Sequence, residues 1–231
     1  MGVKNMENTK IKGISTIIWD CDNTIWIHRK DELEEIIAKA VGIPCTAELK
    51  EQYQGFFDAF DKRFKYEKVT FKKTAKLIEE IMPILSKYGV TGSYFLDKWI
   101  PLETSFVNKE AVEVLKHQRE KGYKIVILTD WFMDSQVMLL NRYGISEYIE
   151  RIYTCDNEYM KTSPKSSKRI IKPGNESEYV IIGDSLNSDI AFANNAKIKS
   201  IWYNPSKNEN TTPYNPTVEI TSLLEVIDII E

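Results

Sequence analysis

Cysteine is scarce in this chain, and the few cysteines lie far apart. Only three occur among 231 residues, Cys21, Cys45 and Cys155, and no two of them form a CxxC pair. An odd number at these spacings argues against a disulfide framework and against a zinc knuckle. We therefore expect an ordinary apolar core, which a chain of this length can bury without covalent staples.

Long apolar runs and a strong charge bias are also missing. No segment approaches the length of a membrane span, and the first ten residues, MGVKNMENTK, lack the apolar run of a signal peptide. With 31 basic and 34 acidic residues the net charge is −3, so nothing points to nucleic acid or a membrane as a partner. We expect a cytoplasmic protein, and the sequence carries no signal for an oligomeric state.

Short β-branched runs do occur, and they alternate with helical patterns. The predicted strands are 14–19, 124–129, 151–155, 179–183 and 200–203, and the predicted helices between them are 109–121, 134–143 and 187–195. KIVILT, the second of these strands, is apolar from its second to its fifth residue, as a strand buried on both faces should be. This alternation predicts a doubly wound, Rossmann-like α/β core with a parallel sheet.

Between about Asp31 and Ser105 the alternation stops, and the sequence predicts helices only. Two apolar stripes at helical spacing predict a helical bundle there, with a kink at Pro83. The stripes consist of Phe56, Phe57, Phe60 and Phe64, and of Phe71, Ala75, Ile78, Met82 and Leu85. We therefore predict a core domain made of residues 1–27 and 106–231, interrupted by a helical domain of residues 28–105.

Polar groups follow four of the predicted strands, where parallel strands would bring them to one edge of the sheet. In chain order these groups are Asp20 and Asp22, then Thr129 and Asp130, then Lys161 with Lys165 as a competitor, then Asp184 and Asp189. Each group alone is as typical of a turn or a cap as of a site. Together they offer hard oxygen ligands, which suit magnesium, and a lysine and a hydroxyl, which suit a phosphoryl group.

The same four segments resemble the motifs of the haloacid dehalogenase superfamily, in the same order. The matching stretches are DCDNT at 20–24, ILTD at 127–130, KTSP at 161–164 and IIGDSLNSDI at 181–190. Thr162 stands where the third motif usually has a proline, and Lys197 where a glycine is common. The resemblance covers roughly residues 11–27 and 106–206. It implies the phosphatase branch (phosphoglycolate phosphatase or nucleotidase-like), with the helical segment in the position of a type 1 cap.

The resemblance implies a role for each catalytic position. Asp20 would be the nucleophile that forms an aspartyl-phosphate, and Asp22 would be the general acid and base. Thr129 and the backbone amide of Asp130 would bind the phosphoryl oxygens. Lys161 would neutralise charge between the nucleophile and the phosphate.

The resemblance also implies a magnesium site. Its ligands would be the Asp20 carboxylate, the main-chain carbonyl of Asp22 and the Asp184 carboxylate. Asp189 would be a further carboxylate of the metal site, either directly or through water.

The expected activity is therefore hydrolysis of a small phosphorylated metabolite such as a sugar phosphate or a nucleotide. Dehalogenating members lack the second aspartate, so Asp22 favours phosphate chemistry, and Thr24 favours a phosphatase over a phosphomutase. A phosphonate-cleaving enzyme with a cap lysine, and a non-catalytic relative that binds a phosphorylated ligand or a protein, stay open as alternatives. IWYNP at 201–205 resembles a stretch of nucleotidase-like members.

Substrate specificity is expected to lie in the helical segment. Four cations there can meet a second anionic group or can be solvated surface, which is the more typical case: Arg63, Lys65, Lys72 and Lys73. Four aromatic residues can stack on a base but are more typical of core packing: Tyr53, Phe56, Phe60 and Tyr66. His28 is either a substrate contact or a surface residue.

Overall fold

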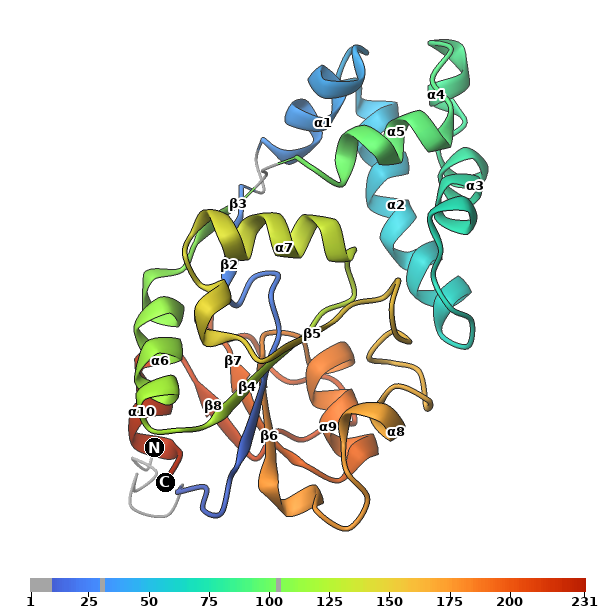
Figure 1. Cartoon of the computed structure of the whole chain (residues 1–231). Helices are drawn as coiled ribbons and strands as arrows, with labels where there is room; N and C mark the ends of the chain where they lie inside the picture. Colours follow the sequence, from blue (N-terminus) through green and yellow to red (C-terminus); the bar gives the residue numbers. More distant parts are fainter. Residues whose placement is uncertain (1–9, 30–31, 103–104) are drawn as a thin grey trace.

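A six-stranded parallel sheet forms the centre of the larger part of the molecule (Figure 1). The computed structural model describes residues 10–29, 32–102 and 105–231. In spatial order the strands are β5 (Arg151–Tyr153), β4 (Lys124–Leu128), β1 (Thr16–Trp19), β6 (Tyr179–Gly183), β7 (Lys199–Tyr203) and β8 (Val218–Ile220). Ile18 of β1 pairs with Val126 on one side and with Ile181 on the other. The predicted doubly wound α/β core is therefore confirmed.

Helices cover both faces of this sheet, because alternate residues of its strands point to opposite faces. Ile17 and Trp19 pack on one side with α6 (Lys109–Glu120), α7 (Met133–Arg142) and α10 (Val226–Ile229). Ile18 packs on the other side with α8 (Ser167–Ile170) and α9 (Ala191–Ala196). A π-helical turn, η4 (Leu186–Ile190), precedes α9, so the helix predicted over 187–195 consists of two different pieces.

A group of helices lies together at one end of the sheet (Figure 1). They are α1 (Leu33–Val41), α2 (Ala47–Phe64), α3 (Phe71–Ile81), α4 (Ile84–Lys87) and α5 (Gly92–Trp99). Thr46, Thr70 and Thr91 start α2, α3 and α5, and each threonine hydroxyl accepts a hydrogen bond from the backbone N–H three residues on. Pro83 does not kink a continuous helix as predicted; it separates α3 from α4, because a proline inside a helix removes a backbone donor and clashes with the preceding turn.

The apolar stripes of this bundle are mostly buried, with two exceptions. Phe56, Phe60 and Phe64 are buried in the cluster that fills the bundle. Phe57 is 39% exposed and Phe71 is 40% exposed, so the prediction that both lie inside is wrong. Phe57 follows Phe56 by one position, and a step of about 100° around a helix turns it to another face.

A two-stranded antiparallel ribbon joins the bundle to the sheet domain (Figure 1). It consists of β2 (Trp26–His28) and β3 (Ser105–Val107). Neither strand was predicted, and the predicted domain boundaries after residue 27 and before residue 106 fall inside this ribbon. None of the helices in the described ranges combines the length and the apolar character that a bilayer span requires.

Candidate active site

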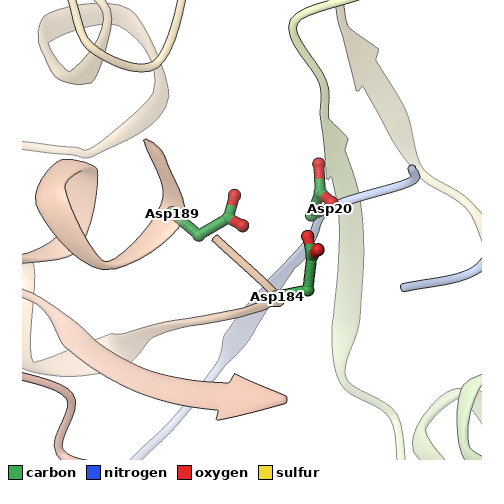
Figure 2. Close-up of side chains that lie close together, drawn as sticks. All are labelled: Asp20, Asp184 and Asp189. Carbon is green, nitrogen blue, oxygen red and sulfur yellow. The ribbon is translucent and has the colours of Figure 1, made fainter. Parts of the chain in front are cut away.

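The carboxyl ends of the central strands bring the predicted polar groups to one place. Asp20 directly follows β1, Thr129 and Asp130 follow β4, and Asp184 follows β6. The Asp20 backbone N–H donates to the carbonyl of Ile182 at 2.9 Å, which continues the pairing of β1 with β6. Figure 2 shows the carboxylates of Asp20, Asp184 and Asp189 gathered around one space.

Lys161 lies inside this group of carboxylates. Its side chain is 4% exposed, and its Nζ makes ion pairs with Asp20 and, at 2.7 Å, with Asp189 Oδ1. Burial opposes the charge, but the two carboxylates outweigh it and hold the pKa of Lys161 well above its usual value. Lys165, its competitor in the sequence, is exposed and its Nζ lies 5.2 Å from the centre of the Tyr159 ring.

The loop that carries Lys161 is held by Asp130, a contact that the sequence analysis missed. The Lys161 backbone N–H donates to Asp130 Oδ1 at 2.8 Å, and Ser188 Oγ donates to Asp130 Oδ2 at 3.0 Å. One carboxylate thus links the segment after β4, the Lys161 loop and the π-helical turn. Sequence separation hides this contact, because the three segments meet only in the folded chain.

Asp189 reaches the site because of two local features. The π-helical turn, with backbone hydrogen bonds from residues 189 and 190 to the carbonyl of Ser185, contains one residue more than an ordinary α-turn would. Gly183 leaves room for the side chain, since a Cβ at this position would lie 2.2 Å from Asp189 Cγ. The Ser185 backbone N–H then donates to Asp189 Oδ2 at 3.0 Å.

The carboxylates of Asp20, Asp184 and Asp189 lie close together. Burial and the repulsion between them raise the pKa values of Asp20 and Asp184. Burial and the charge of Asp189 raise the pKa of Asp20 well above its ordinary value, although Lys161 opposes the shift. Burial and the charge of Asp189 also raise the pKa of Asp184 to about 7. A divalent cation would relieve this repulsion and favour the ionised forms.

The donor set fits magnesium. One carboxylate oxygen from each of Asp20, Asp184 and Asp189 lies within 4.8 Å of the others. All three donors are hard oxygens, and no histidine or cysteine belongs to this group among the described residues. Carboxylates of this kind, with room for waters, suit Mg²⁺ rather than a thiolate-seeking metal.

Asp22 lies beside this group but in a different network. His28 Nε2 lies 3.0 Å from its Oδ1, while Thr129 Oγ1 and Gln136 Nε2 each donate to its Oδ2 at 3.2 Å. Trp26 Nε1 in turn donates to Gln136 Oε1 at 2.8 Å. His28 is therefore a partner of Asp22, a role that the sequence analysis did not consider, and Gln136 was missed because nothing near it in the sequence marks it.

The contacts of Asp22 change the pKa of its carboxyl group and also engage the hydroxyl of Thr129. Burial would raise the pKa of Asp22, but the hydrogen bond with His28 and the charges of His28 and Lys161 together outweigh burial and lower it. The hydroxyl of Thr129, predicted to bind a phosphoryl oxygen, donates to Asp22 here instead. Its role toward phosphate therefore stays a prediction.

A cavity of about 600 Å³ opens above these groups, between the sheet domain and the helical bundle. The bundle contributes residues of α1, α2 and α5, including Tyr53, Phe57 and Phe60. None of the four cations considered in the bundle belongs to the lining that the structure describes. Two of them pair with glutamates on the surface, Arg63 with Glu80 and Lys73 with Glu67, each at 2.7 Å.

Comparison with known proteins agrees with this fold. The family model for haloacid dehalogenase-like hydrolases matches residues 14–197. The chain therefore belongs to the haloacid dehalogenase-like hydrolases.

Individual relatives are more distant. The pyrimidine 5′-nucleotidase PynA of Streptococcus pneumoniae is 29% identical over 127 residues, which cover 52% of this chain and 53% of PynA. A glyceraldehyde 3-phosphate phosphatase of Pyrococcus abyssi is 28% identical over 153 residues, which cover 55% of this chain and 64% of that enzyme. In both cases the matched segment spans less than two thirds of the relative.

Several solved structures are similar along almost the whole chain. Among them is a magnesium-bound crystal structure of the putative hydrolase YfnB of Bacillus subtilis, with a TM-score of 0.70 and 24% sequence identity. The match covers 94% of this chain and 98% of YfnB. At this identity the likeness supports the fold.

Proposed function

We propose that this protein is a magnesium-dependent phosphatase that hydrolyses a small phosphate monoester through an aspartyl-phosphate on Asp20. The observation that carries the proposal is the buried ion-paired group of Asp20, Lys161 and Asp189, with Asp22 beside it at the mouth of a cavity. The names of the relatives support it, since one is called a pyrimidine 5′-nucleotidase and another a glyceraldehyde 3-phosphate phosphatase.

The reaction proceeds in two displacements at phosphorus. A carboxylate oxygen of Asp20 attacks the phosphorus, the bond to the alcohol oxygen breaks, and Asp22 gives that oxygen a proton. Water then attacks the phosphorus of the aspartyl-phosphate, Asp22 accepts a proton from this water, and the Asp20 carboxylate is released with inorganic phosphate. Lys161 neutralises part of the charge throughout both steps, and Thr129 and the Asp130 amide bind phosphoryl oxygens.

Asp22 must hold a proton in the first displacement and lack one in the second. Its lowered pKa in the free protein favours the ionised form, which is the base of the second displacement. A phosphate ester beside it brings negative charge, which raises the pKa of a carboxyl group and favours proton uptake before the first displacement.

The carboxylates of Asp20, Asp184 and Asp189 and the main-chain carbonyl of Asp22 would hold magnesium. When bound, the ion supplies positive charge next to the transferring phosphoryl group. The YfnB structure is a magnesium complex that reveals interdomain movement, which supports both this metal and a mobile cap here.

The helical segment of residues 28–105 is proposed to be a cap that closes over the leaving alcohol and excludes water. Aromatic side chains of this segment contact Trp131 of the core at the wall of the cavity. The ring centres of Trp99 and Trp131 are 4.6 Å apart. The cytoplasmic location expected from the sequence stays a prediction.

Hydrolysis of p-nitrophenyl phosphate, with magnesium and with EDTA, tests the proposal. We expect turnover only with magnesium, and loss of turnover in Asp20→Asn. The control is Asp97→Asn. Asp97 is an exposed residue of α5 that does not belong to the described cavity lining, so this substitution should leave turnover unchanged.

The leaving group provides a sharper test of Asp22. Asp22 also acts as the base of the second displacement, so the test uses kcat/KM, which reports the steps up to loss of the leaving group. Because p-nitrophenolate leaves without a proton, Asp22→Asn should lower kcat/KM for p-nitrophenyl phosphate much less than for an alkyl phosphate, on which we expect a loss of about 10²–10⁴-fold. Equal losses of kcat/KM on both esters would contradict the general-acid role. A folded protein that binds magnesium but turns over no ester would contradict the phosphatase proposal and favour the mutase or binding alternatives.

A further inference from the structure

We infer that the leaving alcohol of the substrate carries a flat, uncharged ring with hydrogen-bond donors and no second anionic group, as a nucleoside 5′-monophosphate does. This inference rests on the proposed phosphatase function and names the class of ester that the cavity accepts. It follows from three properties of the cavity: an aromatic wall, an excess of carboxylates, and an unpartnered buried hydroxyl.

The aromatic wall begins next to the reacting groups. Trp131 directly follows Asp130, and its ring lies 4.6 Å from that of Trp99 on the cap. Phe57 continues the wall, with its ring centre 5.8 Å from Trp99 and 5.3 Å from Tyr53. Phe57 is 39% exposed although it belongs to the cap's aromatic cluster, and its exposed face lines the cavity. A surface of this kind favours a flat unsaturated ring over a small open-chain alcohol.

The charge of the cavity excludes a second anion. Within the lining that the structure describes there are one lysine, no arginine and seven carboxylates. The carboxylates are Asp20, Asp22, Glu34, Asp61, Asp130, Asp184 and Asp189. The one lysine, Lys161, is already paired with two of them at the phosphoryl end, and the histidine of the lining, His28, is paired with Asp22. A second phosphate or a carboxylate on the leaving alcohol would therefore meet Glu34 or Asp61 of the cap without a compensating cation.

The polar groups at the cap end of the cavity are suited to hydrogen-bond donors. Glu34 and Gln54 line the cavity and are hydrogen-bonded to each other, with Gln54 Nε2 as the donor, so Glu34 keeps an acceptor oxygen that this bond does not use. Tyr53 also lines the cavity, is only 2% exposed, and its hydroxyl has no hydrogen-bond partner among the residues that the structure describes. A buried hydroxyl without a partner is costly, and a polar edge of a bound ring would satisfy it.

Two matched pairs of esters test the preference for a ring and the exclusion of a second anion separately. Uridine 5′-monophosphate and ribose 5-phosphate differ by the ring, and thymidine 5′-monophosphate and thymidine 3′,5′-bisphosphate differ by the second phosphate. We expect the ring to raise kcat/KM at least about tenfold. We expect the second phosphate to lower it about 10²-fold. An equal or higher kcat/KM for ribose 5-phosphate, or for the bisphosphate, would overturn the inference.

Single substitutions, each with a matched control, test whether Phe57 and Glu34 cause these two preferences. Phe57→Leu should lower the ratio of kcat/KM for uridine 5′-monophosphate to that for ribose 5-phosphate by about tenfold. The control is Phe71→Leu, because Phe71 is 40% exposed on the same bundle but does not line the cavity. Glu34→Lys should raise the relative use of the bisphosphate, whereas Glu35→Lys should not, since Glu35 faces Lys50 on the surface.

Binding to the Asp20→Asn variant distinguishes failure of the inference from failure of the proposed function. Calorimetric titration of this variant with uridine 5′-monophosphate and with ribose 5-phosphate measures the preference of the cavity without turnover. No hydrolysis of any ester by the wild type would contradict the phosphatase proposal. Equal affinities for the two ligands would contradict the inference, and tighter binding of the nucleotide that is lost in Phe57→Leu would support it.

Discussion

The substitution Lys161→Met removes the one positive charge inside a group of buried carboxylates while keeping a long, unbranched side chain. Lys161 is 4% exposed and pairs with both Asp20 and Asp189. Without it, the two carboxylates and the neighbouring Asp184 face one another, and the described cavity lining keeps no lysine or arginine, while its histidine, His28, is paired with Asp22. The variant should therefore be inactive and also less stable than the wild type in the absence of metal.

The size of the loss follows from the burial of the pair. Removing one partner of a buried ion pair costs about 3–5 kcal/mol, because the remaining charge is left desolvated and uncompensated. For a chain of this length, each kcal/mol corresponds to roughly 2–4 °C in Tm, so we expect Tm in EDTA to fall by about 6–20 °C. Magnesium should restore part of this loss, since it places positive charge among the same carboxylates.

Differential scanning calorimetry in EDTA and in magnesium measures both effects. Lys165→Met is the control, because it removes an exposed lysine from the same loop and should leave Tm and turnover nearly unchanged. The double variant Lys161→Met/Asp189→Asn should regain stability relative to Lys161→Met, since one uncompensated carboxylate is gone. If Lys161→Met melts within about 2 °C of the wild type in EDTA, the claim that Lys161 balances this group is refuted.

Three further perturbations test other parts of the structure. Burial raises the pKa of Asp61 to about 6, so the folded protein holds this proton more tightly than the unfolded chain and loses stability as pH rises from about 4 to 6. Because solvent still reaches the Asp61 side chain and screens its charge, we expect Asp61→Asn to melt only about 1–3 °C above the wild type at neutral pH, with the difference vanishing near pH 4 in a thermal scan. A Cβ at Gly92 would lie 2.0 Å from a main-chain oxygen of α3, so Gly92→Ala should lower the free energy of unfolding in urea by about 1–3 kcal/mol. Gly55→Ala, in a helix with no atom near the new methyl group, should be neutral or stabilising. His28→Leu should slow turnover of an alkyl phosphate roughly tenfold, by removing a partner that orients Asp22, and should slow p-nitrophenyl phosphate less; equal slowing would point to a general structural effect.

The central strands could be predicted from the sequence because each is a continuous apolar run. KIVIL and YVIIG form β4 and β6 within a residue of their predicted bounds, since burial on both faces demands apolar side chains throughout. The strands β2, β3 and β8 have three residues each, and so short a run carries no periodic signal. Their pairing depends on partners that the chain brings together only in the folded state.

The candidate site likewise contains residues that could be predicted from the sequence and residues that could not. Strand ends mark Asp20 and Asp184 in the sequence, because the carboxyl edge of a parallel sheet is where ligands bind. The partners of Asp22 could not be predicted, because His28 and Gln136 reach it from the ribbon and from a helix. The exposure of Phe57 could not be predicted either, since it depends on which face of the bundle the sheet domain leaves uncovered.

The π-helical turn at Leu186–Ile190 has an evolutionary consequence. Its extra residue sets the direction of Asp189, and loss of a single residue there, such as the exposed Asn187, would leave an ordinary α-turn. Each residue of a helix turns by about 100°, so the carboxylate would no longer face Lys161. The sheet, the aromatic wall and the cavity would remain. Under the proposed function, loss of one codon there would remove a carboxylate from the metal site, and we expect the deletion variant to bind the ester without hydrolysing it.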